Sequence, residues 1–394
     1  MDLSFIVVLV IALALFFDFT NGFHDTANAM ATPIATGAMK PRVAVAVAAV
    51  LNLVGAFLST EVAKTISGGI IREGQDGITI GPEMIFAGLM GAIVWNMATW
   101  LFGMPSSSSH ALFGGLIGAA IVGAGVASVD FGVVLSKVII PAIFAPLVAG
   151  GAAFLATRLA YSITRRYDGK PDGRDGFRRA QIFSSGLVAL SHGTNDAQKT
   201  MGVITLVLIS VGALAEKSGP PFWVVVSCAI AIALGTYMGG WRIIRTLGTH
   251  LTEVKPAQGF AAETSTAVTI LASSHVGFAL STTQVASGSI IGSGLGRRGS
   301  KVRWKTARHI VTGWLLTLPA SAAVGAAAAG IALLGAPGVL INAVLGGAAV
   351  LVMYLVSKRK PVSHGNVSEV AESLDAVKIK KNPKPKRKAR GAKS

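Results

Sequence analysis

The chain has 394 residues, of which 52% are hydrophobic and only 13% are charged, and its mean hydropathy is +0.62. A soluble domain carries about 25% charged residues, so this composition excludes a soluble protein and predicts a polytopic, all-α membrane protein. Cys228 is the single cysteine, which excludes a disulfide framework within the chain.

The net charge of +17 is unevenly placed. Basic residues gather in residues 158–179, 297–308 and 358–394. Such clusters can bind nucleic acid, but in a membrane protein the positive-inside rule explains them by placing all three in the cytoplasm. We therefore expect a lipid bilayer and no nucleic acid as a partner. The tail 358–394 is predicted to be disordered and attracted to anionic lipid.

The chain begins with an apolar run over residues 3–17, preceded by Asp2 and by no Lys or Arg. Because a signal peptide has a basic segment before its apolar core, this run predicts a retained first helix. The N-terminus is then expected outside, and the first helix leads inward past Asp25 to Lys40.

One stretch of the sequence occurs twice. Residues 22–29, Gly-Phe-His-Asp-Thr-Ala-Asn-Ala, resemble residues 193–200, Gly-Thr-Asn-Asp-Ala-Gln-Lys-Thr. Residues 107–114 likewise resemble residues 281–288, at almost the same distance further along the chain. A matching order and spacing predict an internal duplication.

Each copy also contains two apolar segments, here called arms, that are joined by a short polar junction. Arms 84–103 and 111–129 are joined by a junction, 104–110, whose one ionisable residue is a histidine. Since non-helical backbone at membrane depth is tolerated in a cavity or inside protein, we expect a re-entrant hairpin there, entering from outside. Arms 262–280 and 285–295 predict a second hairpin, entering from inside.

Counting the crossings places the start of copy one outside and the start of copy two inside. The prediction is therefore two inverted-topology repeats, with helices broken at Gly22 and Gly193, as in many secondary transporters. The expected divisions are a first inverted repeat 1–157, a basic cytoplasmic loop 158–181, a second inverted repeat 182–334, an extra C-terminal transmembrane helix 335–357 and a basic disordered cytoplasmic tail 358–394.

Asp25 and Asp196 are the strongest candidate site residues. A charged side chain at the centre of a membrane helix costs about 2.5–3.5 kcal/mol, so a duplicated one indicates function. A carboxylate repels an anion, so its expected role is to hold a proton or a cation. The alternative is an Asp in an interfacial loop.

The two tips carry hydroxyl groups, at Ser107, Ser108 and Ser109 in copy one and, in copy two, at Ser281, Thr282 and Thr283. Hydroxyls and backbone N–H groups at a helix N-terminus favour a small anion with several oxygens. The alternative is that they only cap the helices.

Three further residues are candidates for proton coupling. His24 and His110 titrate near neutral pH and could carry protons, or they could be neutral hydrogen-bonding residues. Glu263 opens the second hairpin and is an additional candidate ligand for a proton or cation, or else it lies among lipid headgroups.

Lys199 stands where copy one has Asn28. Its ammonium could neutralise Asp196 permanently. In copy one, a bound cation would have to neutralise Asp25 in the same way. The alternative is that the lysine extends to the membrane surface.

These residues resemble the PiT family of inorganic phosphate transporters, over nearly the whole chain up to about Val356. The family motif Gly-Ala-Asn-Asp-x-x-Asn-Ala matches Gly22, Asp25, Asn28 and Ala29, and again Gly193, Asn195 and Asp196. The resemblance implies that phosphate and its coupling ion are surrounded by Asp25, Asn28, Ser107, Ser108, Ser109, Asp196, Ser281, Thr282 and Thr283, with Lys199 beside them. The residues expected to serve coupling are Asp25, Asp196, His24, Asn195, His110 and Glu263.

Three positions depart from the family pattern: His24 and Lys199 replace asparagines, and Gln284 stands where other members often have histidine. The second motif resembles that of bacterial low-affinity members, which implies proton-driven uptake, with a neutral metal–phosphate complex as a further substrate. Lys199 also argues against sodium coupling, because a fixed cation competes for Asp196.

The sequence thus predicts a phosphate symporter that works by alternating access. It is expected in the bacterial inner (plasma) membrane as a multi-pass protein, with the N-terminus outside and the C-terminus in the cytoplasm. We expect no bound cofactor, a co-transported proton, and a divalent metal carried with phosphate as an open alternative. The sequence assigns no metal ligands and leaves a homo-oligomer open.

Three alternatives remain at this stage. The hydroxyl tips would also suit sulfate or another tetrahedral oxyanion, and the coupling ion could be sodium. A different class is an intramembrane hydrolase that uses Ser109, His110 and Asp25. This last reading is disfavoured because adjacent residues on a helix point in different directions and because copy two has Gln284 in place of the histidine.

Overall fold

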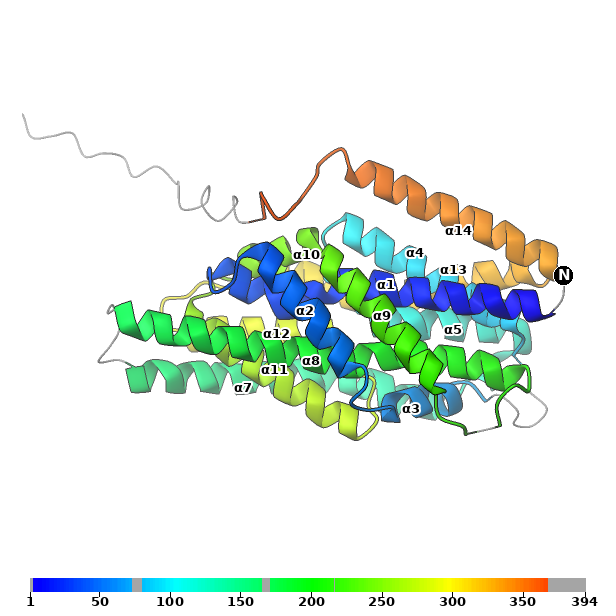
Figure 1. Cartoon of the computed structure of the whole chain (residues 1–394), viewed down its shortest axis with the longest axis horizontal. Coiled ribbons are helices and arrows are strands. Elements are labelled where there is room, and N and C mark those ends of the chain that lie inside the picture. Colours follow the sequence, from blue (N-terminus) through cyan, green and yellow to red (C-terminus); the bar gives the residue numbers. More distant parts are fainter. Residues whose placement is uncertain (1–2, 73–79, 165–170, 216, 368–394) are drawn as a thin grey trace, which may run out of the picture.

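The computed structural model describes residues 3–72, 80–164, 171–215 and 217–367, and this part of the chain is a bundle of helices (Figure 1). The elements are α1 Leu3–Ala35, α2 Pro41–Gly55, α3 Glu61–Gly69, α4 Pro82–Leu101, α5 Ser108–Ala124, η1 Val126–Ser128, α6 Phe131–Val134, η2 Leu135–Ile139, α7 Ile140–Thr164, α8 Pro171–Ser210, α9 Phe222–Met238, α10 Trp241–Arg245, η3 Thr246–His250, α11 Pro256–His275, α12 Thr282–Gly296, α13 Trp304–Ala332 and α14 Ala336–Ser357.

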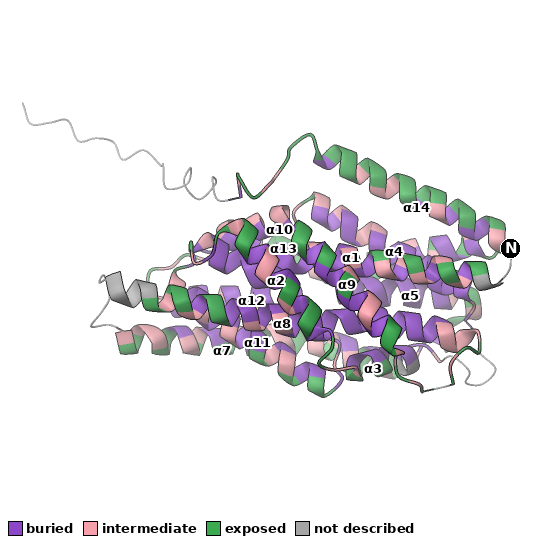
Figure 2. Ribbon diagram, in the orientation of Figure 1, coloured by how far each residue is buried: buried purple, intermediate pink, exposed green. Residues whose placement is uncertain are grey.

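The helices have the lengths and hydropathies of membrane spans. Five described segments are long and apolar enough to cross a bilayer, namely Phe5–Ala35, Pro82–Leu101, Phe131–Thr164, Trp304–Ala332 and Ala336–Ser357. Helix α9 and the α10–η3 segment qualify together as a sixth, with a bend of 58° between them. Figure 2 shows that α14 is largely exposed, and its exposed residues include Leu340, Val344 and Leu351. The chain is therefore a multi-pass membrane protein with apolar side chains outside.

Glycines bring the first helix of each copy against the second helix of the other copy. A Cβ on Gly22 of α1 would lie 2.3 Å from a backbone oxygen of α9, and one on Gly235 of α9 would lie 1.9 Å from a backbone oxygen of α1. The pair α8 and α2 repeats this contact at Gly193 and Gly55, each with 2.2 Å to a backbone oxygen. Only glycine permits such close approach of two helices, which is how membrane helices commonly associate.

The helices that follow the two hydroxyl tips are packed in the same way. In α5, a Cβ on Gly114 or Gly118 would lie 2.3 or 2.0 Å from a backbone oxygen of α13. In α12, a Cβ on Gly288 or Gly292 would lie 2.5 or 2.0 Å from a backbone oxygen of α7. Both pairs are Gly-x-x-x-Gly motifs, which form tight helix contacts.

The predicted breaks at Gly22 and Gly193 are wrong. Helix α1 continues through Gly22 and Asp25 to Ala35, and α8 continues through Gly193 and Asp196 to Ser210. The two glycines are explained by the close helix contacts just described, so they indicate packing and not freed backbone.

The helices also extend further than expected around the basic loop. Helix α7 ends at Thr164 and α8 begins at Pro171, so much of the predicted loop 158–181 is helical. A side-chain interaction supports the extension, since the Arg158 guanidinium lies 5.2 Å from the centre of the Phe154 ring. The expected tail 358–394 lies outside the described residues from position 368 onward.

The contact between α1 and α9 generates the first prediction. Replacing Gly235 with alanine places a methyl group against the α1 backbone, and such overpacking costs about 1–3 kcal/mol. We expect Gly235→Ala to lower the unfolding temperature of the purified protein in detergent.

The matched control is Gly151→Ala, on the exposed face of α7, where an added Cβ meets no described atom within 4 Å. Alanine favours helix over glycine by about 1 kcal/mol, so this variant should unfold at the same temperature or higher. Equal unfolding temperatures for the two variants would contradict the close packing.

Candidate functional site

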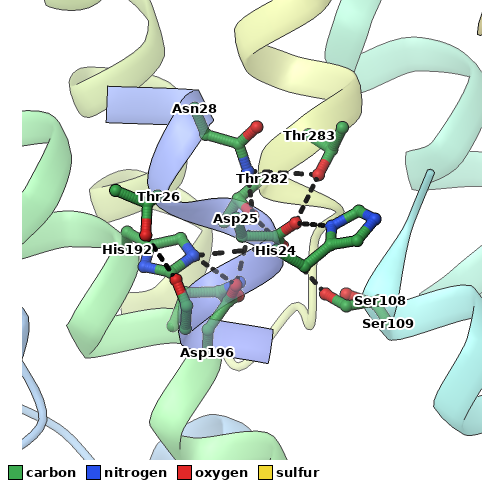
Figure 3. Close-up of polar contacts among 12 residues, drawn as sticks. His24, Asp25, Thr26, Asn28, Ser108, Ser109, His192, Asp196, Thr282 and Thr283 are labelled. Carbon is green, nitrogen blue, oxygen red and sulfur yellow. Dashed lines mark hydrogen bonds and ion pairs between the residues drawn. The ribbon is translucent and has the colours of Figure 1, made fainter. Parts of the chain in front are cut away.

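Four helices converge on a buried polar cluster (Figure 3). Asp25 comes from the middle of α1, and His192 and Asp196 come from the middle of α8. The N-terminal ends of α5 and α12 bring Ser108 and Thr282 to the same place. Asp25 is 1% exposed and Asp196 is 0% exposed, so each carboxylate depends on protein groups or a ligand for its stability.

Three hydroxyl groups serve the Asp25 carboxylate. Ser108 donates to Oδ2 at 3.0 Å, Thr283 to Oδ1 at 3.2 Å, and Thr282 to Oδ2 at 3.4 Å. His24 Nδ1 lies 2.6 Å from Oδ1. These hydroxyls stand at the N-termini of α5 and α12, where the helix dipole also favours negative charge.

Asp196 is surrounded by cationic and amide groups. The Lys199 ammonium, one turn further along α8, contacts Oδ1, and the Asn195 side chain donates to the same oxygen at 2.9 Å. The Thr282 hydroxyl also lies 3.2 Å from Oδ2, so its single hydrogen is shared between the two aspartates. Lys199 is 0% exposed, which excludes its extension to the membrane surface.

His192 joins the two aspartates, although the sequence analysis did not select it. Its Nε2 lies 2.8 Å from Asp196 Oδ2 and 3.9 Å from Asp25 Oδ2. Its Nδ1 lies 3.2 Å from Oδ1 of Asn52, whose amide nitrogen donates to Thr236. Both ring nitrogens thus face oxygen acceptors, which suits an imidazolium. The available signal was its position directly before the second motif, where copy one has a polar Asn.

Some of the residues predicted to bind the anion use their hydroxyl groups to cap helices or to bond the backbone. Ser107 and Ser281 cap α5 and α12 by accepting from the backbone N–H of His110 and Gln284, at 3.2 and 3.3 Å. The capping alternative is therefore realised for these two. Ser109 donates to a backbone carbonyl at 3.1 Å.

The remaining polar groups link the two tips. Asn28 donates to Thr282 and Thr283 at 3.2 and 3.1 Å. His110 Nδ1 lies 3.4 Å from the side-chain nitrogen of Gln284. Residues of both copies therefore meet in one cluster.

Glu263 belongs to a second polar cluster, not to the central one. It is 3% exposed and lies on α11. It accepts hydrogen bonds from Thr32 at 2.6 Å and Gln181 at 2.9 Å, and also from Ser184. The carboxylate is therefore enclosed by protein groups and is not directly exposed to its surroundings.

The central cluster has the chemistry to hold a cation and an anion side by side. Ligand atoms of Asp25, His192 and Asp196 all lie within 4.8 Å of one another. The hydroxyls of Ser108, Thr282 and Thr283 can donate to a carboxylate or to a bound oxyanion. A polar cluster buried between helices of a multi-pass membrane protein is typical of a transporter.

Comparison with known proteins identifies the kind of transporter. A model of the phosphate transporter family matches the chain twice, over residues 21–171 and 160–325. The chain therefore belongs to the phosphate transporter family, which confirms the resemblance to PiT proteins, and it is a transporter and not an enzyme.

Relatives with curated names agree. A probable low-affinity inorganic phosphate transporter of Mycobacterium leprae is 56% identical over 369 residues, covering 93% of this chain and 88% of that protein. A protein of the same name from Bacillus subtilis is 42% identical over 331 residues, covering 83% of this chain and 98% of that protein. A solved structure titled "The sodium-dependent phosphate transporter" is 25% identical with a TM-score of 0.71, covering 84% of this chain and 99% of that chain.

The hydrolase alternative is wrong. The family consists of transporters, and the geometry agrees: Ser109 donates to a backbone carbonyl while His110 contacts Gln284. A nucleophilic serine would need its base within hydrogen-bond reach.

The buried pair of Lys199 and Asp196 generates the second prediction. Replacing Lys199 with methionine removes the ammonium that contacts the buried Asp196 carboxylate, and breaking a buried ion pair typically costs about 3–5 kcal/mol. We expect Lys199→Met to unfold at a clearly lower temperature than the wild type. The double variant Lys199→Met/Asp196→Asn should recover much of this loss, because neither charge remains. A double variant less stable than Lys199→Met would show that the pair is not coupled.

Proposed function

We propose that this protein imports inorganic phosphate by proton-coupled symport across a bacterial inner membrane, through alternating access of one central site. The observation that carries the proposal is that Ser108, Thr282 and Thr283 all donate to Asp25. These hydroxyls lie at helix N-termini, where hydroxyl and backbone N–H groups together are expected to bind a phosphate anion.

Competition for the hydroxyls would couple the two ions. When phosphate takes hydrogen bonds from the tips, Asp25 loses its donors, and a buried carboxylate without donors is unstable. Taking up a proton removes that cost. His24, 2.6 Å from Asp25, is placed to pass the proton. Phosphate binding and protonation of Asp25 would therefore favour each other.

The ion pair in copy two supports a proton over sodium. Asp196 already holds the Lys199 ammonium in contact, and a sodium ion placed at that carboxylate would be repelled by this fixed charge. Sodium coupling is the competing function, because the solved relative with 25% identity is titled as sodium-dependent.

Co-transport of a metal with phosphate is a second candidate. The cluster of Asp25, His192 and Asp196 brings three ligand atoms within 4.8 Å of one another. A divalent cation there would have to displace the Lys199 ammonium from Asp196 and would need His192 in its neutral form. It would then offset the charge of phosphate, and the two would travel as a neutral complex.

Inverted repeats and membrane orientation belong to the same proposal. Helices α1 and α8 begin at opposite ends of the molecule (Figure 1), as inverted copies would. The tips before α5 and α12 meet through Ser109 and Leu280, which is consistent with two re-entrant hairpins. The positive-inside rule places the basic blocks and the C-terminus in the cytoplasm and the N-terminus outside.

The experiment that tests the function is labelled-phosphate uptake into proteoliposomes containing the full chain. An inward proton gradient and an inward sodium gradient are imposed separately, with excess sulfate as competitor. We expect proton-driven, sodium-independent uptake that sulfate does not inhibit. Sodium-driven uptake would show sodium coupling in place of proton coupling. Uptake that requires a divalent metal would support transport of a metal–phosphate complex.

The third prediction concerns Asp25. Asparagine keeps the shape of the side chain but cannot bind and release a proton, and each charge-assisted hydrogen bond lost is worth about 1.5–3 kcal/mol. We expect Asp25→Asn to reduce proton-driven uptake at least tenfold, because a tenfold change corresponds to roughly 1.4 kcal/mol, about the value of one such hydrogen bond.

The matched control is Asp130→Asn. Asp130 caps α6, and its bond from the Val133 N–H lowers the pKa of its carboxyl. Asparagine is an equally good cap, so uptake should be unchanged. Full uptake by Asp25→Asn would refute the role of this carboxylate.

A further inference from the structure

Helix α1 carries two buried carboxyl groups, Asp18 and Asp25, and a third buried carboxyl, that of Glu263 on α11, faces it. Asp18 precedes Asp25 by seven residues, and Thr32, which donates to Glu263, follows Asp25 by seven. Seven residues are almost two full helical turns, so the three positions share one face, about 10 Å apart along the axis. The central site therefore has a buried carboxyl group on either side of it.

Asp18 is the unexplained member of these three carboxyl groups. It is 0% exposed, and neither of its carboxylate oxygens accepts a hydrogen bond from the described residues. The Thr200 hydroxyl of α8 faces the carboxylate without completing a hydrogen bond. An ionised carboxylate in this environment would bear a large desolvation cost, so the geometry calls for an ion that the protein does not itself supply.

Further buried polar groups without hydrogen-bond partners among the described residues lie on α1 and α4. The amide of Asn21, one turn after Asp18 on α1, has none among the described residues. The amide of Asn96 is likewise free, on α4 one turn before Thr99, which contacts His24 at 3.4 Å. Buried polar groups of this kind commonly hold ordered water, which can conduct a proton.

The ionisable groups that act on Asp18 lie on α8 and are Asp196, His192 and Lys199. Cys228 of α9 is in turn affected by the charge of Asp18. The Lys199 ammonium opposes a metal cation nearby, whereas a proton converts Asp18 to a neutral group that Lys199 does not repel.

We propose that Asp18 is a second proton-binding site of the transporter, which delivers its proton to the central cluster past Asn21, Asn96 and Thr200. The inference rests on the proposed proton coupling and adds the route. The Asp18 carboxyl gives up its proton, the Asp25 carboxylate receives it, and Asp18 is reprotonated from the aqueous side nearer the start of α1.

Two assays on proteoliposomes of the full chain separate delivery of protons from binding of phosphate. The first is exchange of labelled for unlabelled phosphate at equal pH on both sides, which needs no net proton movement. The second is accumulation of phosphate driven by an inward proton gradient. We expect Asp18→Asn, which resembles the protonated residue, to keep exchange and to lose gradient-driven accumulation. Asp18→Glu should retain both, and Asp130→Asn is the control for the same chemical change elsewhere.

Each other outcome overturns the proposal. Accumulation by Asp18→Asn equal to the wild type would show that Asp18 carries no transported proton. Loss of exchange as well would show a structural role or a role in phosphate binding. If Asp18→Asn abolishes accumulation driven by sodium, the site binds sodium. Failure of the proposed function is distinct, because then the wild type itself would not respond to the proton gradient.

Discussion

The structure depends on how it stabilises Asp25, a carboxylate that is 1% exposed in the middle of a membrane helix. The apolar interior provides no solvation, so every donor must come from a neighbouring helix. Ser108 and Thr283 supply hydroxyls from two different helix N-termini, and His24 supplies a ring nitrogen at 2.6 Å. The same donors suit a phosphate oxygen, so under the proposed coupling the charge of the carboxylate depends on the substrate.

Such short contacts require helices that approach closely. The glycines of α1, α9, α2 and α8 bring backbones together where a methyl group would not fit, and the Gly-x-x-x-Gly motifs of α5 and α12 hold the two tips in place. Packing through small residues gives little hydrophobic gain in a membrane, so it is the fit of the surfaces that fixes the position of the polar groups. The abundance of glycine, 47 residues in all, is thus part of the site's architecture.

Much of the fold was predictable because apolar runs of membrane length and a repeated motif are strong signals. Helix α4, Pro82–Leu101, lies within two residues of the predicted arm 84–103 at each end. The continuity of α1 through Gly22 was not predictable, since a glycine beside a charged motif also suits a broken helix. Only the packing of α9, so close that an added Cβ would lie 2.3 Å from its backbone oxygen, explains the glycine. His192 and Asp18 were missed because their importance lies in contacts between helices distant in sequence. The repeat pattern also misled for Asp18, because copy two has Ala189 at that position.

The two copies share a scaffold but differ in charge, and this difference is informative. Lys199 replaces Asn28, so Asp196 carries a permanent counterion while Asp25 has hydroxyls and histidines. A fixed ion pair does not change its charge during a cycle, whereas a carboxylate held by exchangeable donors can. Duplication therefore supplied two equivalent carboxylates, and divergence left Asp25 without a permanent lysine counterion. In the proposed proton coupling, this one variable charge would keep the site close to neutral when phosphate enters, which is the condition for moving an anion through an apolar interior.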